Sequence, residues 1–318
     1  MKIEPYNKLI ENFLYWKSAF LQRAKAKNLS PNTIRNYERA LDEFEDYLRG
    51  YNGEISFSQI NKPFLELYLI HLRENRKYSE STISVHFTIL KSFFLYITEE
   101  NDEQADFTKI FRKLAVKKGK MVRPTLAREE VERVIAYVES VARQKGDYAS
   151  IRDSLIIKLL ALTGMRASSL LGLKLYDFTL IEHEGKMLYE ILIKQKGNKE
   201  NRVYVLADEI AWELANIKRF IHGDSLLFLG RDKKPMHRVS LYNKVVSLLK
   251  KSGINKKGVH IFRHTFVKLK REEGVDLSTI KALLGHSSIT TTINIYGAAD
   301  ERDKINAALS GKKSKRGN

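Results

Sequence analysis

The feature that most constrains this chain is a short basic segment, residues 113–124 (KLAVKKGKMVRP), which cannot form part of a hydrophobic core. Five of its twelve residues are Lys or Arg, and it also holds one Gly and one Pro. Because 318 residues exceed what one ordinary core supports, the segment predicts two domains joined by a linker. The linker is either a solvated tether or a strand that lies along a polyanion, and the sequence leaves both open.

Residues 1–112, before the linker, are predicted to form a helical domain. Ser30 followed by Pro31 is typical of a helix start, since Ser caps the first amides and Pro fits the first turn. Apolar residues then recur at helical spacing until Gly50, which is predicted to end the helix. The same spacing indicates further helices over 13–20, 64–72 and 81–97.

Residues 125–300 are predicted to form a second domain. The runs 187–193 (MLYEILI) and 202–206 (RVYVL) favour β-strands, and the charged stretch KQKGNKEN between them predicts a hairpin tip. Helices are predicted over 129–141, 153–162, 210–221, 240–249, 260–272 and 278–284. The fold class is therefore mainly α with a small β-sheet (α+β). Residues 301–318 are predicted to be a C-terminal helix and a basic tail.

The charge balance predicts a polyanionic partner. The chain carries 56 Lys and Arg against 38 Asp and Glu, a formal net charge of +18. So much self-repulsion does nothing for folding, whereas Lys and Arg bind nucleic acid by displacing counterions from its phosphates. With no Cys, disulfides and thiolate metal sites are excluded. The start of the chain shows no signal-peptide pattern, and the longest apolar stretch, 155–165, is broken by Lys158. We therefore expect a cytoplasmic protein with no membrane partner.

Three short motifs could carry chemistry. In HIFRH, His260 and Arg263 would share one face of a helix. His260 and His264 have the spacing of a zinc-protease pair, but Ile261 stands where the general-base Glu of HExxH belongs, so no metal is expected.

The other two motifs are weak signals by themselves. Thr163-Gly164-Met165-Arg166 follows an apolar helix, and a turn there would leave Arg166 at the mouth of a buried helix junction. That arginine could equally serve a structural ion pair. Gly285 in Leu284-Gly285-His286 is typical of a helix end. A single tyrosine such as Tyr296, ten residues beyond His286, is usually structural.

Together the motifs resemble the tyrosine recombinase family of phage integrases and Xer-type resolvases. The order is an Arg, a Lys on a hairpin, HxxRH, LGH and then a Tyr. The likeness covers nearly the whole chain and is strongest from 163 to 296. Before the linker, SPNTIRNYERALDEFEDYL resembles the helical, SAM-like core-binding domain of the family. The resemblance implies a C-terminal catalytic domain with six site residues: Arg166, Lys196, His260, Arg263, His286 and Tyr296.

The resemblance also implies a role for each residue. Arg166 and Arg263 would bind the non-bridging phosphate oxygens, and Tyr296 would be the nucleophile. His260 would act as acid or base, and His286 would hydrogen-bond the phosphate. Lys196 would protonate the leaving oxygen, although Lys194 and Lys199 are close competitors for that role. No cofactor is implied.

Two positions depart from the family pattern. Ser169 stands where an acidic residue usually follows the first arginine, so an altered rate or pH profile is expected. Gly297-Ala298-Ala299 stands where many members carry a His two residues after the tyrosine. Neither change removes a core catalytic group.

The implied partner is duplex DNA with an inverted-repeat site, held by a homotetramer on two sites, with or without a second recombinase. Strands would be exchanged through a Holliday junction. The helix after Tyr296 would pack in cis or on a neighbouring protomer, and the sequence does not decide which. Two alternatives are a catalytically silent DNA-binding protein of the same fold and a DNA-relaxing enzyme like type IB topoisomerases. Integrase and chromosome-dimer resolvase also remain open.

Overall fold

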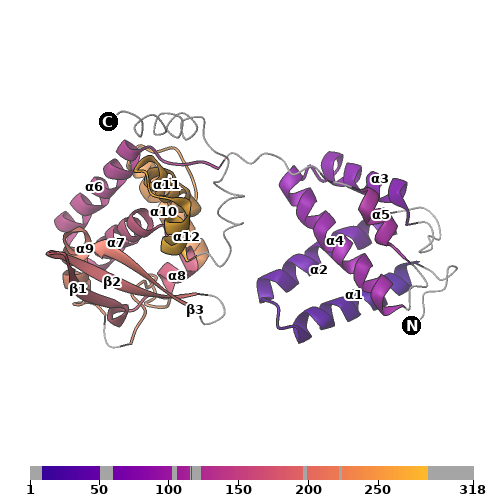
Figure 1. Cartoon of the computed structure of the whole chain (residues 1–318), viewed down its shortest axis with the longest axis horizontal. Coiled ribbons are helices and arrows are strands. Elements are labelled where there is room, and N and C mark those ends of the chain that lie inside the picture. The colour runs from indigo at the N-terminus through magenta and orange to yellow at the C-terminus, as the bar shows by residue number, and fades with distance from the viewer. Residues whose placement is uncertain are drawn as a thin grey trace, which may run out of the picture. The chain divides into compact units, whose positions relative to one another are not determined.

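The structure, a computed structural model, describes residues 9–50, 60–101, 106–114, 116, 123–195, 199–221 and 224–285. The chain divides into two compact units, Met1–Met121 and Val122–Asn318. The boundary between the units falls inside the basic segment 113–124. Figure 1 shows both units, and each is described here by itself.

The first unit is helical throughout its described part. Its helices are α1 (Leu9–Ala26), α2 (Pro31–Arg49), α3 (Lys62–Glu74), α4 (Glu80–Glu100) and α5 (Thr108–Lys113). The predicted start of α2 is confirmed: Ser30 lies before the helix, its side chain accepts a hydrogen bond from the Thr33 amide, and Pro31 occupies the first turn. Gly50 ends the helix as expected.

Aromatic side chains fill the core of the first unit. Phe13, Phe44, Tyr68, Phe93 and Phe94 are all fully buried. They meet mostly edge to face, with ring centroids 4.8 Å apart for Phe44 and Tyr68 and 5.3 Å apart for Phe13 and Phe93, a geometry that adds to the energy of burial. This core is separate from that of the second unit.

The second unit combines helices with a small antiparallel sheet. Its helices are α6 (Arg128–Lys145), α7 (Tyr148–Thr163), α8 (Ala167–Leu171), α9 (Ala207–Ile217), α10 (Arg238–Lys251), α11 (His260–Glu272) and α12 (Leu277–Leu284). Its described strands are β1 (Phe178–His183), β2 (Lys186–Gln195) and β3 (Lys199–Leu206), in the order β1-β2-β3. Helix α7 is buried nearly all round and packs against α6, α9 and α11, and the sheet packs against α9 and α7 (Figure 1).

The predicted fold class is confirmed, and the predicted hairpin is formed by β2 and β3. Strand β1 was not predicted, because its side chains show no regular alternation of buried and exposed positions. Leu180 is 51% exposed, so what defines this edge strand is its pairing with β2, as between Ile181 and Leu188. In the described part of the chain, no helix is both long and apolar enough to cross a membrane.

Gly164 and Gly146 both end helices in the left-handed conformation, but only Gly164 is sterically confined. Gly164 ends α7 with φ 60°, and a Cβ built on it would lie 2.9 Å from the Phe266 ring. Gly146 ends α6 with φ 62°, and a Cβ there would meet nothing within 4 Å. The absence of a side chain at Gly164 therefore allows α7 to approach α11 closely. Gly146 has no such neighbour.

We predict that Gly164→Ala destabilises the protein more than Gly146→Ala. Both substitutions carry the cost of a left-handed Ala, about 1–2 kcal/mol, and Gly164→Ala adds about 1–3 kcal/mol for the overlap with Phe266. Urea unfolding of the two variants and the wild type measures the difference. Equal losses of unfolding free energy would show that α11 moves freely away from α7.

Candidate active site

The junction of α7 and α8 positions Arg166. Helix α7 ends at Gly164, and Arg166 is the N-terminal cap residue of α8, with extended backbone angles. The predicted place of Arg166, at the mouth of a buried helix junction, is what the structure shows. Its side chain is half-buried, and this burial lowers the pKa of the guanidinium. Among the described residues no carboxylate pairs with it.

Helix α11 places Arg263 in the interior, where the residue is only 6% exposed. Its Nη1 donates a 2.8 Å hydrogen bond to the carbonyl oxygen of Gly164, and its Nη2 donates a 3.2 Å bond to that of Leu284. These carbonyls lie at the C-terminal ends of α7 and α12. Carbonyls at helix ends lack intrahelical partners and carry the negative end of the helix dipole, so they are good acceptors for a cation.

Both arginines line one small cavity. Its other lining residues are Met165, Ser169, Ile193, Asn201, Val203, Leu283 and Leu284. The cavity thus collects side chains from α8, α11, both strands of the β2–β3 hairpin and the end of α12. Ser169, the residue that departs from the family pattern, is one of them and is buried.

His260 and His264 lie one turn apart on α11. Partial loss of hydration, and then the charges of Arg263 and Arg166, lower the pKa of the His260 imidazole, and Arg238 and Arg123 add to the effect. Loss of hydration and the charge of Arg123 lower the pKa of His264 to about 4. Both rings are therefore neutral near pH 7, and a neutral imidazole can accept a proton.

The hairpin leads towards the arginines. Ile193 on β2 faces Asn201 on β3, and both line the cavity with Arg166 and Arg263. Lys196, in the connection between these strands, lies outside the described residues. Its competitor Lys194 is exposed and pairs across the ladder with Glu200.

The described part of the second unit ends beside the same cavity. Gly285 ends α12 in the left-handed conformation, as predicted. His286 and Tyr296 lie outside the described residues. Three of the six predicted site residues are therefore described, and the structure brings Arg166 and Arg263 to one cavity with His260 close to both charges.

Sequence reasoning missed two kinds of residue. Arg123 and Arg238 add positive charge around His260. Arg123 belongs to the basic segment 113–124, whereas nothing in the local sequence sets Arg238 apart. Asn201 could have been noticed, because it is a polar residue on the strand face that carries the buried Val203 and Val205. Among the described residues, no three His, Cys, Asp or Glu side chains gather closely enough to hold a metal ion.

A helical domain followed by an α+β domain with two arginines and a histidine at one site is the layout expected of a DNA strand-transferring enzyme. Sequence profiles agree: the phage integrase family matches residues 124–302, and its N-terminal SAM-like domain matches residues 19–101. The chain therefore belongs to the phage integrase family and is a site-specific tyrosine recombinase.

Individual relatives agree with this assignment. Tyrosine recombinase XerH of Campylobacter jejuni subsp. jejuni serotype O:2 is 29% identical over 294 residues, which are 89% of this chain and 79% of that protein. Tyrosine recombinase XerD of Halalkalibacterium halodurans is 28% identical over 299 residues, or 91% of this chain and 93% of that protein. The crystal structure of XerH bound to palindromic difH substrate, a post-cleavage complex, matches with a TM-score of 0.79 and 25% identity, covering 97% of this chain and 99% of that one.

The neutral state of His264 generates a prediction about acid stability. Because its pKa of about 4 in the folded protein lies below the ordinary value of 6.5, the unfolded chain binds a proton first as the pH falls. The stability contributed by neutral His264 is complete above about pH 6.5 and is lost as the pH falls towards about 4. Between about pH 7 and pH 5, we expect the free energy of unfolding of His264→Asn to fall by about 1 kcal/mol less than that of the wild type, after allowance for solvent screening.

Calorimetric melting at the two pH values tests this prediction. One kcal/mol corresponds to about 2–4 °C for a unit of this size. A fall in melting temperature that is as large in His264→Asn as in the wild type would assign the acid sensitivity to other groups.

Proposed function

We propose that this chain cuts and rejoins duplex DNA at an inverted-repeat site through a covalent bond between Tyr296 and a phosphate. The observation that carries the proposal is the cavity lined by Arg166 and Arg263, with His260 in the field of both and no carboxylate paired to Arg166 among the described residues. A half-buried cation of this kind is stabilised by an anion, and a DNA phosphate supplies one. The structures of XerH, which is bound there to a difH substrate, support DNA as the partner.

The two arginines would stabilise the transition state. Attack of a hydroxyl on a phosphodiester places extra negative charge on the non-bridging oxygens of a five-coordinate phosphorus. Guanidinium groups bind such oxygens in pairs and stay charged at any working pH. Hydrogen bonds from Arg263 to Gly164 and Leu284 hold that group in place before substrate arrives, and a preorganised donor is typically worth about 3–4 kcal/mol.

His260 would take the proton of the attacking phenol. A phenol with a pKa near about 10 is protonated at neutral pH and needs an acceptor. The lowered pKa of His260 keeps its ring neutral and ready for that role. His286 would add a hydrogen bond to the phosphate.

Lys196 would protonate the 5′-oxygen as it leaves. The hairpin that carries it places Ile193 and Asn201 in the cavity with both arginines, and this supports the assignment over a lysine elsewhere. The bond energy of the phosphodiester would be kept in a 3′-phosphotyrosine, so rejoining to a partner strand requires no ATP.

The assembly we propose is a homotetramer on two sites that exchanges strands through a Holliday junction, in the cytoplasm. Residues 1–112 would be a core-binding domain and 125–300 the catalytic domain, and together they would clamp the duplex. The basic segment 113–124 would be the linker, and 301–318 a C-terminal helix and tail. The net charge of +18 supports a long contact with phosphates.

The proposal predicts that a covalent adduct forms and depends on Tyr296. Protein incubated with DNA that flanks its own gene, quenched in detergent and digested, should retain fragments that map to one inverted-repeat site. Tyr296→Phe removes only the nucleophilic oxygen and should abolish the adduct while leaving DNA binding intact. Sequencing of the protein-bound fragments is the measurement.

Each other outcome has a distinct meaning. Adducts in both proteins would show that another residue is the nucleophile. Relaxation of any supercoiled plasmid by a monomer, with no site preference, would favour a topoisomerase. Equal DNA binding by both proteins, with an adduct from neither, would favour a silent DNA-binding protein.

A further prediction concerns the leaving group. Lys196→Ala should slow cleavage by about 10²–10⁴-fold, the usual contribution of a general acid. On DNA with a 5′-bridging sulfur at the cleaved bond, which leaves without a proton, the variant should cleave nearly as fast as the wild type. Lys194→Ala is the matched control and should be close to wild type on both substrates. If the sulfur substrate rescued Lys194→Ala and not Lys196→Ala, Lys194 would be the general acid.

A further inference from the structure

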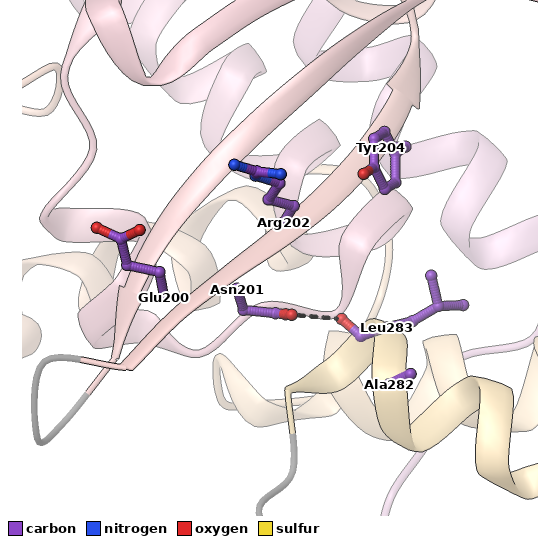
Figure 2. A pocket seen from close by; sticks show the side chains of 6 residues that line it. All are labelled: Glu200, Asn201, Arg202, Tyr204, Ala282 and Leu283. Atoms are coloured by element: carbon purple, nitrogen blue, oxygen red, sulfur yellow. Dashed lines mark hydrogen bonds between the residues drawn. The ribbon is translucent and has the colours of Figure 1, made fainter.

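The C-terminal end of α12 is held by side chains from two other elements. The Gly285 amide bonds back to the carbonyls of Ala282 and Lys281. The next two carbonyls are taken from outside the helix: Asn201 Nδ2 donates to Leu283 at 3.4 Å, and Arg263 Nη2 donates to Leu284 at 3.2 Å. Figure 2 shows the Asn201 side chain directed from β3 to this end of the helix.

Besides these two bonds, a small apolar cluster fixes α12 among the described residues. It is a helix of 8 residues, too short to be stable by itself. Its buried side chains, Ile280 and Leu284, join a small cluster with Phe266 and Val267 that is separate from the main core of the unit. The two hydrogen bonds at its C-terminal end therefore help to fix the position of that end.

Asn201 is an unusual residue for its place in the sheet. It lies on the inward face of β3, which continues with the buried Val203 and Val205. A polar amide there costs free energy unless it is hydrogen-bonded. Its amide group instead faces the cavity of Arg166 and Arg263 and holds the end of α12.

We infer that Asn201 is a positioning residue that docks the end of α12 onto β3 and so sets where the chain leading to Tyr296 begins. The inference rests on the proposed function of Tyr296. The docked carbonyls come immediately before Gly285, and the nucleophile follows eleven residues later, from 285 to 296. A small displacement at this point shifts the origin of the whole segment, and a misplacement of about 1 Å can slow a reaction about 10²-fold.

The test uses Asn201→Leu in the full chain. Leucine has the branched shape of asparagine and suits an inward strand position, but it cannot donate a hydrogen bond. Asn216→Ala is the matched control, because Asn216 also donates its amide to a carbonyl, that of Trp212, within α9. Hydrogen exchange should show the amides of α12 opening about 3- to 10-fold faster in Asn201→Leu, the effect of one lost hydrogen bond. Exchange in α11 should be unchanged.

Cleavage is then measured in single turnover on a duplex suicide substrate built on the site mapped by the Tyr296 adduct. We expect Asn201→Leu to bind this DNA as the wild type does and to cleave it about 10-fold more slowly or worse. The loss should persist on the 5′-sulfur substrate, because positioning of the nucleophile does not depend on protonation of the leaving group. Asn216→Ala should match the wild type throughout.

Several results would overturn the inference. Unchanged exchange and unchanged cleavage would show that Asn201 holds nothing of consequence. Full rescue by the 5′-sulfur substrate would mean that Asn201 acts through the hairpin of Lys196 instead. A variant that fails to fold would assign Asn201 to the stability of the sheet. Failure of the proposed function is recognised separately, since then the wild type itself forms no Tyr296-dependent adduct.

Discussion

The arrangement of the catalytic unit depends on one buried guanidinium. Arg263 joins the C-terminal ends of α7 and α12 by donating to Gly164 and Leu284. Phe266 lies three residues after Arg263 on the same face of α11. Its ring occupies the space that a side chain on residue 164 would need. Arg263 and Phe266 therefore both lie against Gly164. The turn after Gly164 leads to Arg166, so the bond from Arg263 to Gly164 helps to fix the backbone next to Arg166.

Two buried cations elsewhere in the same unit have acidic partners. Lys158, with a side chain 3% exposed, pairs with Glu139 and Glu213. Arg152 pairs with Asp153, and Lys244 meets the other oxygen of that carboxylate. Burying an unpaired charge is costly, and within the described residues Arg166 has no such partner. This difference supports the proposal that Arg166 binds a phosphate.

Much of the fold could be predicted because local chemistry determined it. Ser30 and Pro31 start α2 by capping and by a fixed φ angle, and Gly285 ends α12, whatever the rest of the chain does. Strand β1 could not be predicted, because its outer position leaves no regular pattern and only its partner strand defines it. The motif residues were visible in the sequence. The role of Asn201 was not, because its partner Leu283 lies 82 residues away and accepts with a backbone atom.

The replacement of an acidic residue by Ser169 fits the electrostatics of the cavity. A carboxylate there would compete with a phosphate for the positive charge of Arg166, whereas a serine hydroxyl carries no charge. The apolar side chains of Met165, Ile193 and Val203 line the same cavity, and a weakly polarisable lining strengthens the attraction between a guanidinium and an oxyanion. The carbonyls of Gly164 and Leu284 orient Arg263 without neutralising it. Backbone carbonyls can therefore orient a guanidinium at this cavity, a role that a carboxylate could otherwise perform.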